Sequence, residues 1–185
     1  MKNEHATKES EPWIEEFTRL YETAVQTFAN GVRGPDRVFS DKDTKQLAAI
    51  GATPQEIYDF VEDWHDAGEP DFPTVLRITA VRRDYFLREQ HGNPSDKNVS
   101  MNDLPSMSAV LGGYRWLPRI IEKAKAKLQG EMPRELMYGC GGDRPFLRKI
   151  GIDPAEFLQV VWETRSDEQQ ILDYVKHKSS GPHPT

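Results

Sequence analysis

The sequence repeats itself at an offset of 100 residues, and this repeat constrains the fold more strongly than any other feature. Aligned without a gap, segment 50–63, which reads IGATPQEIYDFVED, matches segment 150–163, which reads IGIDPAEFLQVVWE. The identical pairs are Arg19/Arg119, Glu22/Glu122, Ala24/Ala124, Asp43/Asp143, Leu47/Leu147, Ile50/Ile150, Gly51/Gly151, Pro54/Pro154, Glu56/Glu156 and Val61/Val161. Such a repeat predicts two related structural units. Two copies are too few for a solenoid, so we expect the units to pack as a pseudo-twofold pair.

The shared pattern Gly-x-x-Pro-x-Glu is typical of a point where one helix ends and the next begins. Gly51 is expected to take the left-handed conformation that ends many helices. Thr53 is then the expected N-cap, Pro54 the first helical residue, and Glu56 the partner that closes a capping box. In the second copy Asp153 takes the place of Thr53. The pattern therefore indicates architecture rather than a binding site.

Apolar residues at spacings of three and four predict four helices in each unit. In each unit a long amphipathic helix comes first, and an aspartate, Asp43 or Asp143, is expected to cap the short helix that follows. The expected helices cover 13–28, 44–50, a stretch from 54, and 73–90 in the first unit, and 117–128, 144–150, a stretch from 154, and 167–177 in the second. No stretch shows convincing strand alternation. The sequence therefore predicts an all-α fold of two related four-helix units.

The segment 92–106 is expected to link the two units, because it lacks a periodic apolar pattern and is rich in turn-forming residues. The first unit is then 1–91 and the second is 107–178, which leaves 179–185 as a disordered tail. Charge is distributed unevenly along the chain. The net charge is −6, yet lysine and arginine outnumber aspartate and glutamate between 114 and 150.

Composition argues against several classes of protein. An acidic chain is unlike a general nucleic-acid-binding protein. The apolar runs are far shorter than the ~20 residues of a membrane span. The first residues, MKNEHATKESEP, contain no apolar signal core, and the single cysteine cannot form an internal disulfide. We therefore expect a cytoplasmic protein without a membrane anchor, and no motif predicts a metal or a cofactor.

Several short motifs follow one another in the second unit. They are Gly112-Gly113-Tyr114, Leu117-Pro118-Arg119, Glu122-Lys123-Ala124, Tyr138, Cys140 and Asp143. With these motifs, residues from about 105 to 178 resemble a bacterial family known as domain of unknown function 5069. This chain has Cys140-Gly141-Gly142-Asp143 where members often have Cys-Pro-Leu-Asp, so the local backbone is expected to differ. The resemblance implies a helical fold and assigns no activity.

A basic stripe in the second unit is the leading candidate for a binding site. Arg115, Arg119, Lys123 and Lys127 recur every four residues, which places them on one face of a helix. The first copy lacks this positive character, so the fold does not require it. A solvated helix face is the alternative interpretation. We expect the stripe and the turn near Cys140 to bind a small anion or an acidic protein partner. The candidate ligand-binding residues are Tyr114, Arg115, Arg119, Lys123, Tyr138, Asp143 and Arg144.

Cys140 supports a rival hypothesis, a thiol-dependent enzyme or redox sensor. It precedes a predicted helix start and lies near Arg144 and Arg148 in the sequence, surroundings that lower the pKa of a thiol. A cysteine nucleophile usually needs a base, and only a contact with a distant histidine such as His65 would supply one. A buried structural thiol is the alternative, so the sequence leans toward a protein that is not an enzyme.

A third hypothesis is a structural protein that self-associates through exposed tryptophan and tyrosine side chains. The oligomeric state stays open at this level.

Overall fold

The computed structural model describes residues 11–179, and within them the chain is mostly helical. The helices are α1 (Pro12–Ala29), α2 (Pro35–Val38), α3 (Asp41–Ala49), α4 (Pro54–Ala67), α5 (Phe72–Arg88), α6 (Leu117–Gln129), α7 (Asp143–Ile150), α8 (Pro154–Glu163) and α9 (Glu168–Ser179). A 3-10 helix covers Met101–Asp103, and strands β1 (Val110–Leu111) and β2 (Tyr114–Arg115) form an antiparallel hairpin. The predicted helical class is confirmed. The sequence predicts neither α2 nor the hairpin, because both are too short to leave a periodic apolar pattern.

The third helix of each unit begins where the shared pattern predicts. The Thr53 hydroxyl accepts a hydrogen bond from the backbone N–H of Glu56 at the start of α4, and the Asp153 carboxylate accepts one from Glu156 at the start of α8. Glu156 completes the predicted capping box. Glu56 does not complete its own, because its carboxylate contacts Lys127 instead. An acidic side chain is thereby turned toward the interior between the two halves.

The predicted caps of the short second helices are wrong in both units. At α3 the N-cap is Ser40, whose hydroxyl accepts from the Asp43 backbone N–H while the Asp43 carboxylate accepts from the Ser40 N–H. At α7 the N-cap is Gly142, and Asp143 is the first helical residue. The Asp143 carboxylate is buried and accepts hydrogen bonds from other segments. Asp43 therefore stabilises a helix start, whereas Asp143, which aligns with it in the sequence, is a buried hydrogen-bond acceptor.

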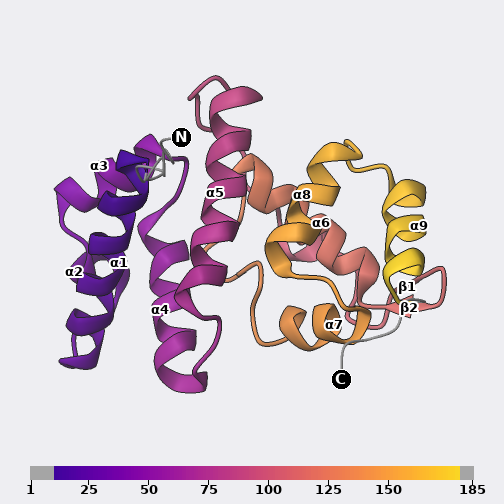
Figure 1. Ribbon diagram of the computed structural model, residues 1–185, viewed down its shortest axis with the longest axis horizontal. Helices are drawn as coiled ribbons and strands as arrows, with labels where there is room; N and C mark the ends of the chain where they lie inside the picture. Colours follow the sequence, from indigo (N-terminus) through magenta and orange to yellow (C-terminus); the bar gives the residue numbers. More distant parts are fainter. Residues whose placement is uncertain (1–10, 180–185) are drawn as a thin grey trace, which may run out of the picture.

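Helix α5 joins the two halves of the molecule (Figure 1). Helix α1 packs on α4 in the first half and α6 packs on α8 in the second, while α5 packs against both α6 and α8. The buried apolar side chains form one cluster that includes Ile57 and Val61 of α4, Ile78 of α5, and Phe157 of α8. Burial of apolar surface is the main favourable term in folding. The two halves therefore depend on one shared core.

The structure does not confirm the predicted pseudo-twofold arrangement. The fourth helices of the two units occupy different positions, because α5 lies between the halves whereas α9 packs on α7 at the far end of the second half (Figure 1). The unit limits 1–91, 92–106 and 107–178 stay predictions. Of the predicted tail 179–185, Ser179 ends α9 and the other residues lie outside the described part of the chain.

The segment before α6 is fastened to the end of that helix. The Val99 backbone N–H donates to the Glu131 carbonyl at 2.9 Å, and the Ser95 hydroxyl donates to the Glu131 carboxylate at 2.6 Å. Leu104 is buried within the same segment. The chain therefore closes over one side of α6 although this segment contains no α-helix.

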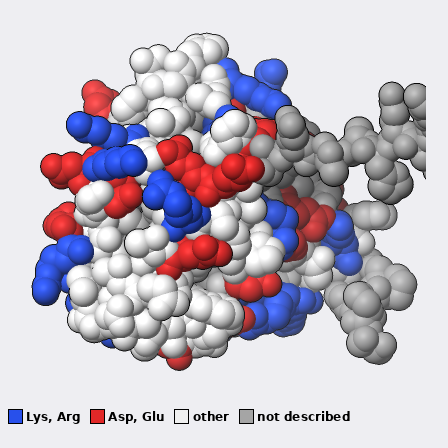
Figure 2. All heavy atoms as spheres, turned by 60° about the vertical axis from the view of Figure 1, so that its left-hand side comes forward, with Lys and Arg blue, Asp and Glu red and all other residues white. Residues whose placement is uncertain are grey.

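Charges of both signs share the surface of the first half. Figure 2 shows acidic and basic side chains interspersed on the face that this half turns forward. Mixed charge of this kind keeps a surface solvated without creating a field of one sign. Among residues 11–179, no helix is long and apolar enough to cross a membrane.

Candidate ligand-binding cavity

The predicted basic stripe is buried except at its first residue. Arg115 in β2 is exposed, whereas Arg119, Lys123 and Lys127 of α6 are 9%, 2% and 2% exposed. Helix α6 lies inside the second half, and its basic side chains meet the segment before the helix, the turn at Cys140, the start of α7 and α4. The expectation of an exposed basic face is therefore wrong for these three residues.

Lys123 and Asp143 form a buried ion pair beside Cys140. The Lys123 ammonium donates to the Asp143 carboxylate and also to the Cys140 sulfur, at an Nζ–Sγ distance of 3.2 Å. The carboxylate further accepts from Trp116 Nε1 and from the Gly139 backbone N–H, each at 2.9 Å. Cys140 itself is half-buried. The cluster combines a thiol, a cation and a carboxylate, although its hydrogen bonds are already made within the fold.

The remaining candidate residues are also paired internally. Their hydrogen-bond partners are the Pro105 carbonyl for Arg119, the Pro154 carbonyl for Tyr138, the Gly139 carbonyl and Asp63 carboxylate for Arg144, and the Ser179 hydroxyl for Tyr114. Burial raises the pKa of Tyr138 well above its usual value, so its hydroxyl remains a donor. The structure thus gathers Lys123, Cys140 and Asp143, with Arg144 beside them, and leaves Tyr114 apart at the hairpin.

The structure also bears on two other hypotheses, a histidine base for Cys140 and self-association through exposed aromatic side chains. His65 contacts Asp66 and the ring of Phe28, so these are its partners rather than Cys140. Of the tryptophan and tyrosine side chains, Trp64 alone is exposed, at 39%, and the others are half-buried or buried. A surface rich in exposed aromatic side chains, which the self-association hypothesis needs, is therefore lacking in the described residues.

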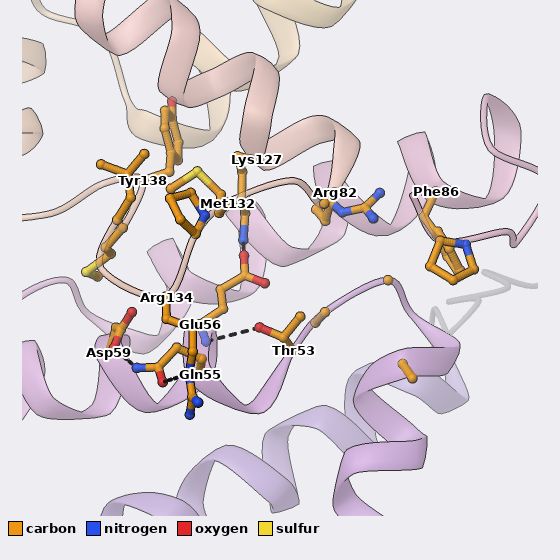
Figure 3. Close-up of a pocket in the computed structure, with 18 residues that line it drawn as sticks. Thr53, Gln55, Glu56, Asp59, Arg82, Phe86, Lys127, Met132, Arg134 and Tyr138 are labelled. Carbon is orange, nitrogen blue, oxygen red and sulfur yellow. Dashed lines mark hydrogen bonds and ion pairs between the residues drawn. The ribbon is translucent and has the colours of Figure 1, made fainter. Parts of the chain in front are cut away.

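A cavity of about 330 Å³ lies between the two halves, and the sequence does not predict it (Figure 3). Residues of α4, α5, the end of α6 and the segment 130–138 line it. The lining is mainly apolar and includes Ala52, Phe86, Met132 and Met137. Small-molecule sites are typically concave, mainly apolar and roughly 300–1,000 Å³ in volume, with a few polar groups that orient the ligand. The cavity has these properties.

Lys127 and Glu56 meet in this cavity. Figure 3 shows Lys127 reaching from α6 toward Glu56 of α4, and the two side chains form an ion pair. The Lys127 Nζ also lies 5.6 Å from the centre of the Phe60 ring, a favourable position for a cation. Burial lowers the pKa of Lys127 to about 7, whereas the Glu56 carboxylate acts in the opposite direction by favouring the ammonium form. The protonation of this lysine therefore depends on whether Glu56 stays in contact with it.

Arg82 is the second cation of the cavity, and it comes from α5. It is 3% exposed, and its Nη1 donates to the Gln90 side-chain carbonyl at 2.7 Å. Its guanidinium lies 5.2 Å from the Phe86 ring centre and close to Gly130, where an added Cβ would be 2.5 Å from Nη2. Burial lowers the pKa of Arg82 to about 10, so it stays charged at neutral pH. Within residues 11–179, no carboxylate forms an ion pair with it.

A chain of polar side chains reaches the edge of the cavity. The Gln55 side-chain amide donates to the Asp59 carboxylate at 2.8 Å, and Arg134 Nε donates to the Gln55 carbonyl oxygen at 3.4 Å. Burial raises the pKa of Asp59 to about 6. Arg134 is exposed, so this chain runs from solvent toward the interior.

The sequence does not predict the cavity, because each of its polar residues, taken singly, fits an ordinary structural role. Glu56 fits a capping box, and Lys127 fits a helical stripe. Arg82 carries the one available signal, because it follows Val75 and Ile78 and precedes Phe86 on the apolar face of α5. A charged residue is almost never fully buried without a partner, so an arginine on the apolar face of a helix indicates a role beyond packing.

The fold and the cavity together define a mostly helical protein with a candidate small-molecule site at the junction of its halves. Residues 101–185 match the model of a family described as a domain of unknown function, DUF5069, which confirms the resemblance seen in the motifs of the second unit. No curated protein and no solved structure matches the chain. The family match includes Lys127, whereas Glu56 and Arg82 precede it. Within the described residues, no group of three or more histidine, cysteine, aspartate or glutamate side chains is placed to hold a metal ion.

Proposed function

We propose that this protein binds a small ligand with an apolar body and one anionic group in the cavity between its two halves. The observation that carries the proposal is Arg82, a buried guanidinium that lines the cavity without a carboxylate partner among the described residues. Buried charges in proteins are generally paired, because an ion removed from water costs several kcal/mol. An anion in the cavity supplies the missing partner.

The surroundings of Arg82 compensate its charge only in part. The end of α6 presents backbone carbonyl groups near Gly130, and a helix end of this kind carries roughly half a negative charge. Gln90 adds one neutral acceptor. A carboxylate or phosphate oxygen accepts stronger, charge-assisted hydrogen bonds and matches the planar fork of a guanidinium. This supports an anionic group at the Arg82 end of the cavity.

The rest of the cavity supports a small and mainly apolar body. Its volume of about 330 Å³ is at the lower end of the usual range for ligand pockets, roughly 300–1,000 Å³. That volume favours a small anion over the acidic protein partner that the sequence left open. The proposal keeps the predicted anionic ligand and moves its anchor from Arg119 and Lys123, which are already paired, to Arg82. We place this activity in the cytoplasm, because a single cysteine cannot form an internal disulfide and so fits a reducing compartment.

The internal repeat also remains a proposal, supported by the identical pairs and by the successive helices α3–α4 and α7–α8. If the units are related, the cavity lies where they differ. Thr27 occupies the position of Lys127, and Glu156 completes a capping box where Glu56 turns inward. A departure from the shared pattern at these positions supports a role beyond folding.

A matched pair of ligands tests the proposed function. Octanoate and 4-phenylbutyrate are compared with their neutral amides by thermal shift and by isothermal titration calorimetry. The carboxylates are expected to bind at least about tenfold more tightly than the amides, because a buried hydrogen bond to a charged group contributes about 1.5–3 kcal/mol. The preference for the carboxylate is expected to vanish in Arg82→Met and to persist in Arg88→Met, whose arginine lies on the same helix with a 70% exposed side chain.

Three results of this comparison support or overturn the proposed binding of an anionic ligand. Binding of the carboxylates with the stated preference supports the proposal. Failure of every carboxylate to bind overturns it, and so does an unchanged preference in Arg82→Met. The variant is expected to fold, because methionine is a long, flexible apolar side chain and the substitution removes a charge that is costly to bury.

A second candidate function, thiol chemistry at Cys140, is favoured by one contact. The Lys123 ammonium donates a hydrogen bond to the sulfur at 3.2 Å, and a lysine beside the sulfur is a typical surrounding of reactive cysteines. Iodoacetamide labelling of the native protein at pH 7, followed by intact mass, tests this candidate, with Cys140→Ser as the control. Labelling faster than that of free cysteine supports it. Labelling only after denaturation overturns it and leaves Cys140 as a structural thiol.

A further inference from the structure

We propose that Lys127 forms a reversible imine with the carbonyl carbon of the bound ligand, so that the ligand is an oxo acid. The inference rests on the proposed function, because Arg82 is taken to hold the carboxylate of the same molecule. It adds a covalent step and a substrate class that ligand binding alone does not require.

The position of Lys127 provides what an amine nucleophile needs. Its side chain is buried, it lines the cavity, and Met132 and Tyr138 line the same space. Lysine is activated as a nucleophile when an apolar pocket desolvates its ammonium group. The lowered pKa of Lys127 is consistent with this placement. A carbonyl compound that enters the cavity would therefore meet a buried lysine that is already in contact with a proton acceptor, the Glu56 carboxylate.

Glu56 is placed to handle the protons of the reaction (Figure 3). Its carboxylate contacts Nζ and first accepts a proton from the ammonium. The neutral amine then forms a bond to the carbonyl carbon, and the carbonyl oxygen takes up a proton to give a carbinolamine. Nitrogen loses a proton, the hydroxyl group leaves as water after protonation, and a C=N bond forms. One amine and one carbonyl give one imine and one water, so no oxidant or reductant is required.

The neighbouring lysines of α6 lack this combination. Lys123 is as buried as Lys127, but Asp143 and Cys140 accept its hydrogen bonds and it does not line the cavity. Lys125 is 25% exposed and pairs with Glu122 on the surface of the helix. The reaction is therefore expected at Lys127 and not along the whole basic helix.

Reductive trapping tests the inference. The protein is incubated at pH 7 with 4-oxopentanoate or 4-formylbenzoate, reduced with sodium cyanoborohydride, and examined by intact mass and peptide mapping. We expect one added ligand per chain, located on Lys127, and loss of this adduct in Lys127→Arg. The matched control Lys125→Arg, on the same helix, is expected to trap the ligand as the native chain does. Lys127→Arg keeps the positive charge opposite Glu56, which preserves the ion pair.

The outcomes separate the inference from the proposed function. Pentanoate and benzoate, which lack the reactive carbonyl, are measured in parallel for binding that depends on Arg82. If they bind and the trapped adduct is absent or spread over surface lysines, the imine is refuted and the proposed function stands. If neither the acids nor the oxo acids bind or react, both fail. If Lys127→Arg does not fold, the location of the adduct in the mapped native chain still decides between Lys127 and the other lysines.

Discussion

Lys123 and Asp143 are both almost completely removed from water, and each is stabilised by the other. Such a pair contributes little beyond what an apolar pair would, yet removal of one partner leaves an uncompensated buried charge. Asp43, which aligns with Asp143 at the 100-residue offset of the sequence, instead completes a capping box at the surface with Ser40. Two aspartates at aligned sequence positions are therefore expected to contribute differently to the free energy of unfolding.

Alanine substitution at these two positions makes the difference measurable. Asp143→Ala is expected to lower the free energy of unfolding by about 3–5 kcal/mol, because it leaves Lys123 buried and unpaired. Asp43→Ala is expected to cost about 1 kcal/mol, because it removes the hydrogen bond that the Asp43 carboxylate accepts from the Ser40 N–H in the capping box. Urea denaturation followed by circular dichroism gives both values. Equal losses in the two variants would contradict a buried role for Asp143.

Asp59 predicts a pH dependence of stability. Its pKa in the folded protein is about 6, above the ordinary value of 3.8, because burial disfavours the carboxylate. The protonated form is therefore favoured by folding, and its stabilising contribution is present below about pH 4 and is lost as the pH rises through about 6. Asp59→Asn removes this titration, so its stability relative to the native chain is expected to rise between pH 4 and pH 7. A constant difference over that range, measured by urea denaturation, would refute the assignment.

At the scale of elements, the ends of helices position the cavity. Gly51 lies in the turn that follows α3 and lines the cavity, and Gly130, the C-cap of α6, lies against Arg82. Both glycines have a positive φ, of 70° and 71°, which other residues adopt only with strain. The turns that end these helices therefore let Phe86 and Arg82 approach the backbone closely.

Gly51 and Gly68 form a matched pair for testing this approach. Both have a φ near 70°, but an added Cβ at Gly51 would lie 2.6 Å from the Phe86 ring, whereas nothing lies within 4 Å at Gly68. Gly68→Ala is expected to cost about 1–2 kcal/mol of backbone strain. Gly51→Ala is expected to cost an additional ~1–3 kcal/mol through overpacking. Similar melting temperatures of the two variants would show that Phe86 moves aside without cost.

The positions of the helices can be predicted from local sequence signals, whereas the cavity cannot. Caps and apolar spacing predict α1, α4, α5, α6 and α8 closely, because these signals act within a few residues of the chain. The burial of Lys123 and Lys127 depends on what packs across α6, and sequence spacing contains no such information. The contact of Glu56 with Lys127 joins two helices more than sixty residues apart, and the capping pattern gave Glu56 another role. Sequence reasoning therefore located the chemistry of α6 and missed the cavity that it faces.

At the scale of the whole molecule, one core spans both halves, and this predicts cooperative unfolding. Trp64 reports on the first half, and Trp116 and Trp162 report on the second. Because α5 packs against α6 and α8, loss of either half exposes the buried face of the other. Tryptophan fluorescence and circular dichroism are expected to give the same single urea transition. Two separated transitions would indicate halves that fold independently.

We propose that the cavity between the halves holds an anion on Arg82. A crystal structure of the protein with the carboxylate that binds most tightly in the calorimetric series tests this most directly. We expect the apolar body to fill the cavity and the carboxylate oxygens to lie about 2.7–2.9 Å from the Arg82 guanidinium nitrogens. A carboxylate bound at the surface, or at Arg144 or Arg115 with the cavity unoccupied, would contradict it.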